Sequence, residues 1–103
     1  MIVESGKTST GWWRKWSDGF IEQGGKSENV DRSGLNISFA KSFSDTNYYV
    51  LATVTGVNSS DTGNNEYGLT VAHPTSKSSF KVYLRSFENG YVSKPIYWYA
   101  NGY

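Results

Sequence analysis

The chain has 103 residues, which suits one domain, so residues 1–103 are taken as a single domain. The formal net charge is +1 without a run of like charges, which excludes the basic stripe that nucleic-acid binding requires. The absence of cysteine excludes a disulfide framework and a thiolate metal site, and the longest apolar runs, such as residues 48–52, are too short for membrane insertion.

The apolar residues are those that favour β-structure. Aromatic residues make up 17% of the chain, as four Trp, eight Tyr and five Phe, whereas Leu and Ala contribute four each. Aromatic and β-branched side chains lose rotamer freedom in a helix but pack well on a pleated sheet. Composition therefore predicts an all-β protein.

A first strand is predicted over residues 2–6, and a β-hairpin follows around Asp18-Gly19. Asp-Gly between two β-rich runs favours a two-residue type I′ turn, since both central positions of that turn need positive φ. A two-residue turn also fixes the register across the hairpin. It pairs Trp16 with Ile21, Lys15 with Glu22, and Arg14 with Gln23.

Residues 26–34 are polar and end in glycine, which predicts a loop. Alternating apolar residues predict the later strands, at residues 35–40, 48–55, 67–73, 80–86 and 96–100. The strand at 48–55 is apolar on both faces at its start, so a central, fully covered position is predicted for it. Parity predicts a core that includes Trp16, Phe39, Tyr49, Leu69, Phe80 and Leu84.

The number and spacing of these strands predict the architecture. Seven or eight short strands follow one another at roughly ten-residue intervals, with turn residues between them. This pattern is typical of an antiparallel two-sheet β-sandwich.

The sequence does not predict a catalytic site. His73 is the only histidine, and its place before Pro74 marks the end of a strand. No G-x-S-x-G nucleophile motif occurs, and most of the scattered carboxylates occupy turns, where Asp and Glu serve local structure. We therefore expect a binding protein, not an enzyme, with no cofactor and no metal.

Two polar loops carry the predicted ligand-binding residues. Asn and Asp side chains bind sugar hydroxyls through paired donors and acceptors, and an aromatic ring covers the apolar face of a sugar. The alternative is that these residues only form turns. The candidates are Asn58, Asp61, Asn64 and Asn65 in one loop, and Glu88, Asn89 and Tyr91 in the other.

Three separated motifs carry a family resemblance. GWWRKWSDGFIEQGG, NISFAKSFSDTNYYVLATVTG and IYWYANGY together resemble the C-terminal domain of bacteriophage tail-fibre proteins. That family shows an aromatic-Arg-Lys-Trp-Ser-Asp-Gly hairpin, an F-x-D-T-x-Y-Y-V strand and a W-Y-A-x-G-Y terminus. The resemblance extends from about Ile2 to Tyr103.

The segments VESGK, ISF, SSFKVY and IYW are more distantly similar to H-type lectins of snails, which are six-stranded sandwiches that trimerise and bind N-acetylgalactosamine. The resemblance implies an H-type lectin-like sandwich of six to eight strands. The lectins contact the sugar with a Trp-His-Asn turn, whose matching positions here are Phe87, Glu88 and Asn89. Glu88 departs from that motif, so specificity for galactosamine is not carried over.

The resemblance implies a homotrimer at the distal end of a fibre in the virion, where it binds a host surface polysaccharide or lipopolysaccharide. Two alternatives stay open: a structural cap that trimerises the fibre without binding a receptor, and a free-standing lectin of a bacterium or prophage. If Met1 is an added start, the natural chain continues upstream into a fibre shaft.

Overall fold

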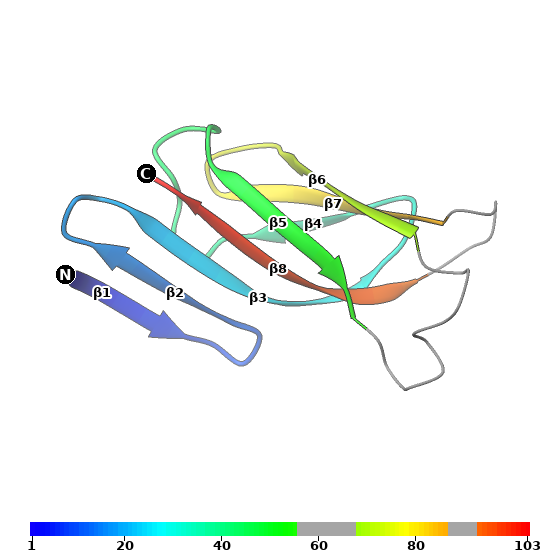
Figure 1. Cartoon of the computed structure of the whole chain (residues 1–103), viewed down its shortest axis with the longest axis horizontal. Coiled ribbons are helices and arrows are strands. Elements are labelled where there is room, and N and C mark those ends of the chain that lie inside the picture. The colour runs from blue at the N-terminus through cyan, green and yellow to red at the C-terminus, as the bar shows by residue number, and fades with distance from the viewer. Residues whose placement is uncertain (56–67, 87–92) are drawn as a thin grey trace.

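The computed structural model describes residues 1–55, 68–86 and 93–103, and these residues form eight strands and no helix (Figure 1). The strands are β1 (Ile2–Lys7), β2 (Gly11–Trp16), β3 (Ile21–Val30), β4 (Leu35–Ser38), β5 (Tyr49–Val54), β6 (Gly68–Pro74), β7 (Ser79–Ser86) and β8 (Lys94–Gly102).

The strands form two antiparallel sheets that pack face to face, as predicted (Figure 1). The larger sheet has the order β1-β2-β3-β8-β5, and the smaller has the order β4-β7-β6. The C-terminal strand β8 therefore lies inside the larger sheet, between β3 and β5. The last strand of the chain therefore joins β5 to the rest of the larger sheet.

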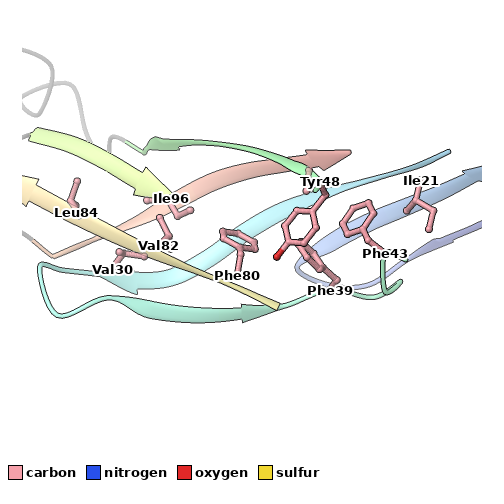
Figure 2. Close-up of a cluster of buried hydrophobic side chains, with 10 residues drawn as sticks. Ile21, Val30, Phe39, Phe43, Tyr48, Phe80, Val82, Leu84 and Ile96 are labelled. Carbon is pink, nitrogen blue, oxygen red and sulfur yellow. The ribbon is translucent and has the colours of Figure 1, made fainter. Parts of the chain in front are cut away.

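The core lies between the sheets and is rich in aromatic residues (Figure 2). Strand β7 contributes Phe80, Val82 and Leu84, which are completely buried. Phe39 lies 5.0 Å, centroid to centroid, from the rings of both Phe43 and Tyr48. The predicted burial of Phe39, Phe80 and Leu84 is confirmed.

Three other core predictions are wrong. Tyr49 is 75% exposed and Leu69 is 61% exposed, while Trp16 is only partly buried. Alternation groups residues on one face of a strand but does not say which face turns inward. On β5 and β6 the smaller alternate residues, such as Ala52 and Ala72, pack against the core instead.

The predicted central position of the strand at 48–55 is also wrong. Strand β5 pairs with β8 and ends the larger sheet. Its outer face carries Tyr49 and Leu51, which remain 75% and 70% exposed. Within one chain, therefore, only one face of β5 is buried, although both faces carry apolar residues.

The hairpin at Asp18-Gly19 is confirmed, but its predicted register is wrong by one residue. The loop has three residues: the Trp16 N–H donates to the Phe20 carbonyl at 2.8 Å, and the Gly19 N–H donates to the Trp16 carbonyl at 3.0 Å. Gly19 has a φ of +94°, as expected for a turn followed by a bulged glycine. The observed pairs are Lys15 with Ile21, Arg14 with Glu22, and Trp13 with Gln23.

The predicted loop at residues 26–34 begins later than expected, because β3 continues to Val30. Val30 is completely buried, and the pairing of β3 with β8 resumes at Asn29 after an irregularity that follows Lys26. Within this irregularity the Ser27 hydroxyl accepts a hydrogen bond from the Ile96 N–H at 3.1 Å. Tertiary pairing therefore makes a strand of a segment whose composition favours a loop.

Candidate functional site

The predicted ligand-binding residues lie outside the described residues, in segments 56–67 and 87–92. These residues are Asn58, Asp61, Asn64, Asn65, Phe87, Glu88, Asn89 and Tyr91.

A groove of about 600 Å³ opens between β4 and the strands β2 and β3. One wall consists of residues 35–40, which comprise β4 and the two residues after it. The opposite side includes Gly11, Gly24 and residues 26–28, together with the turn between β1 and β2. Its volume falls within the range of about 300–1,000 Å³ that is usual for ligand sites.

Glycines determine the backbone geometry beside this groove. Gly11 pairs with Gly25, and a Cβ on Gly25 would lie 2.2 Å from the Thr10 carbonyl oxygen. That oxygen accepts the Lys26 N–H at 2.9 Å, so the turn between β1 and β2 packs directly on β3. The Gly24-Gly25 pair inside a strand is the sequence signal of such a close approach.

The groove combines an apolar floor with a polar rim. Ile37 and Trp98 are partly buried against the core but still line the groove. The Trp98 ring packs against Phe39 and Phe80 at centroid distances of 5.7 and 5.4 Å, which fixes its position. The rim carries exposed side chains that bond to no other described residue: Thr10, Lys26, Glu28, Asn36 and Ser38.

A second cluster lies on the outer face of the larger sheet. The Glu22 carboxylate accepts hydrogen bonds from the Trp16 indole N–H at 3.2 Å and the Tyr99 hydroxyl at 2.8 Å. Burial, and then the Glu22 carboxylate, raises the pKa of Tyr99. The guanidinium of Arg14, which pairs with Glu22 in the sheet, lies 5.3 Å from the centre of the Trp12 ring.

An exposed apolar face occupies the outer side of β5 and β8 in the larger sheet. The Thr70 hydroxyl donates to the Ala52 carbonyl at 2.6 Å and holds β6 against the edge of β5. A shallow hollow of about 220 Å³ lies among residues 51–53 and 97–99. The apolar side chains exposed on this face are Tyr49 (75%), Leu51 (70%) and Tyr97 (53%), while Leu69 (61%) and Val71 (47%) are exposed on β6 of the smaller sheet.

His73 is exposed one residue before the end of β6, so its prediction as a strand-end residue is confirmed. Within residues 1–55, 68–86 and 93–103, no three His, Cys, Asp or Glu side chains gather in a way that could hold a metal ion. The same residues contain no helix that is long and apolar enough to cross a membrane.

The two antiparallel sheets that pack face to face define an all-β sandwich domain. Residues 15–103 match the model of the family described as "Putative tail fiber protein gp53-like, C-terminal". The chain belongs to this family of C-terminal tail-fibre domains, which confirms the resemblance stated from the sequence. Tail-fibre proteins are components of phage or pyocin particles.

Solved pyocin tail fibres share the fold. The N-truncated R2-type pyocin tail fibre is similar with a TM-score of 0.69 at 16% identity, over 98% of this chain and 38% of that chain. The N-truncated R1-type fibre has a TM-score of 0.68 at 18% identity, over 97% of this chain and 84% of that chain. A longer R1 pyocin fibre fragment from P. aeruginosa has a TM-score of 0.62 at 15% identity, over 97% of this chain and 28% of that chain.

This chain therefore spans well under half of two of those fibre chains. At these identities the likeness establishes the fold. No curated protein matches the chain at a significant level.

Proposed function

We propose that the chain is the trimeric receptor-binding tip of a tail fibre, located at the distal end of the particle, and that it binds a host surface glycan such as lipopolysaccharide. The observation that carries this proposal is the membership of residues 15–103 in a family of tail-fibre C-terminal domains. The role is one of binding and needs no cofactor or catalytic group.

The exposed apolar face supports the trimer. Tyr49, Leu51 and Tyr97 are large side chains that are more than half exposed on one sheet face. Contiguous exposed apolar surface in a soluble domain marks an interaction site, and aromatic residues are enriched at subunit interfaces. Two further copies of the chain cover this face in the proposed trimer, so that it becomes buried as the core is.

The chemistry of the two polar loops supports glycan binding. The segments 56–67 and 87–92 connect strands of the sandwich and combine Asn and Asp with Tyr91. Loops on a rigid sheet scaffold are common binding surfaces. Single sugar contacts are weak, and three sites in one trimer supply avidity.

Adsorption to cells tests this proposal. The fluorescently labelled trimer should bind some strains of a bacterial panel, and periodate oxidation of the cell-surface glycans should abolish that binding. Asn89→Ala removes a paired donor and acceptor, and Tyr91→Ala removes a stacking ring. Each should abolish adsorption while the melting temperature and the mass of the trimer stay unchanged, and normal adsorption by both variants would exclude the loops as the receptor site.

The same experiment distinguishes the alternatives. A structural cap remains trimeric but binds none of the strains. A free-standing lectin adsorbs to cells, but its gene encodes no fibre shaft upstream of residue 1, which sequencing of the genomic neighbourhood determines.

A further inference from the structure

We propose that the groove between β4 and the strands β2 and β3 is a binding site for a neutral sugar unit. This inference builds on the proposed glycan-binding function but places a contact at described residues. The central observation is the juxtaposition of a fixed, partly exposed Trp98 with a rim of unengaged polar side chains.

The floor of the groove has the character of a sugar-stacking surface. Trp98 pairs with Gly25 in the sheet, so no side chain from that position of β3 stands beside the indole. Phe39 and Phe80 pack against the ring, at centroid distances of 5.7 and 5.4 Å. A preorganised ring loses little rotamer freedom when a ligand binds, and its apolar face suits the C–H face of a sugar.

The rim has the character of a hydroxyl-binding surface. Asn36 and Ser38 are exposed on β4, and their side chains bond to no other described residue. An amide and a hydroxyl each offer both donors and acceptors, as a sugar hydroxyl does. By contrast, the Gln23 amide, which also lines the groove, already donates to the Lys41 carbonyl at 2.7 Å and accepts from the Lys41 N–H at 3.1 Å.

The charges of the rim favour a neutral ligand. Lys26 and Glu28 both line the groove and are both exposed, so one cation and one anion flank the site. An anionic ligand such as a phosphate would gain from Lys26 but be repelled by Glu28. A neutral hexose is repelled by neither charge. Its hydroxyls can accept a hydrogen bond from the Lys26 ammonium and donate one to the Glu28 carboxylate.

An extended peptide fits the groove less well. A peptide would bind by adding a strand to the edge of β4 that does not pair with β7. However, β4 contains only four residues, and only alternate residues of an edge strand point their backbone groups outward. The edge therefore offers few main-chain hydrogen bonds, and we favour the sugar.

Nuclear magnetic resonance of the ¹⁵N-labelled chain tests the inference. The probes are glucose, galactose, N-acetylglucosamine and rhamnose at millimolar concentrations, with the acetylated tetrapeptide Thr-Val-Thr-Val as a comparison. At least one sugar should shift the amide resonances of residues 35–40 and the indole resonance of Trp98. Shifts confined to segments 56–67 or 87–92, shifts by the peptide alone, or no shift at all would overturn the inference.

Three variants sharpen the result. Ser38→Trp places a large ring in the mouth of the groove and should abolish the shifts. Asn36→Ala removes one neutral hydrogen-bonding group and should raise the dissociation constant about 2–10-fold. His73→Trp, on an exposed position of β6 that does not line the groove, is the matched control and should bind as the parent does.

The two proposals fail separately. If the chain adsorbs to cells but no sugar shifts the groove resonances, the groove inference is wrong and the receptor-binding function stands. In the opposite case, sugars shift the groove resonances but the trimer adsorbs to none of the strains, even after the panel is widened to Gram-positive cells. The receptor function is then wrong, and the groove still binds sugars.

Discussion

At the scale of single residues, Gly19 is required by backbone conformation. Its φ of +94° lies in the region that favours glycine, and a Cβ there would meet nothing closer than the Tyr103 ring at 3.9 Å. Gly19→Val therefore introduces backbone strain at a position where the added Cβ itself has room, and we expect a loss of about 1–3 kcal/mol in the free energy of unfolding. Urea denaturation measures this loss.

Gly19→Asn is the control for that experiment, because Asn tolerates positive φ better than a β-branched residue does. The Asn variant should lose clearly less stability than the Val variant. Equal stability of both variants and the parent would show that residue 19 does not need its positive φ.

Tyr48 predicts a pH dependence of stability. Its ring is buried, and its hydroxyl shares its one proton between the carbonyls of Ser76 and Ser79, at 2.9 and 2.7 Å. Burial raises its pKa above the ordinary value. Above about pH 10 the unfolded chain loses this proton while the folded chain keeps it, so stability falls as pH rises towards the folded pKa. Below that window the contribution is fully present.

Melting temperatures from pH 8 to pH 11 check this expectation. Tyr48→Phe removes the titrating group and should flatten the decline above about pH 10. Tyr103→Phe changes an exposed tyrosine and is the comparison. A decline that is equally steep in the Tyr48→Phe variant would contradict a folded-state origin in Tyr48.

At the scale of elements, Gln23 ties strand β3 to the segment after β4. The side chain is 1% exposed, accepts the Lys41 N–H at 3.1 Å and donates to the Lys41 carbonyl at 2.7 Å. Gln23→Leu keeps a similar volume but leaves both backbone groups unpaired, so we expect a loss of about 1–3 kcal/mol. Thermal or chemical denaturation measures it.

Lys41→Ala is a matched control, since it keeps the backbone groups that Gln23 binds. It removes the ion pair with Glu4, whose charged atoms are 3.3 Å apart at the surface, and the contact of its ammonium with the Trp13 ring at 4.6 Å. An exposed pair contributes about 0–1 kcal/mol. If the Lys41→Ala variant is less stable than the Gln23→Leu variant, the Lys41 side chain, and not the hydrogen bonds between Gln23 and the Lys41 backbone, holds this segment.

At the scale of the whole molecule, the apolar outer face predicts the oligomeric state. We expect a trimer in sedimentation equilibrium at micromolar concentration. Leu51→Glu places a carboxylate in the proposed interface, where burial of an unpaired charge is costly, and should yield a folded monomer. Thr46→Glu, at an exposed position outside that face, should remain trimeric. A monomeric parent, or a trimeric Leu51→Glu variant, would contradict the proposed interface.

The sequence by itself determined the fold class and most of the strands. Composition excluded helices, because aromatic and β-branched residues are costly there, and turn residues such as Asp18-Gly19 marked the boundaries. The buried face of strand β7 was predicted correctly, since Phe80, Val82 and Leu84 alternate with Lys81, Tyr83 and Arg85. These signals are local, so they can be interpreted without knowing which strands pair with one another.

The tertiary structure alone decided the register, the edges and the groove. A three-residue loop shifted the hairpin by one position, and pairing with β8 extended β3 to Val30. Sheet order put β5 at an edge and left Tyr49 exposed, although its sequence favours burial. The groove arises where β4 lies across from Gly11 and Gly24, which are distant in the sequence. Each of these features depends on which strands become neighbours, and alternation within one strand carries no information about its neighbours.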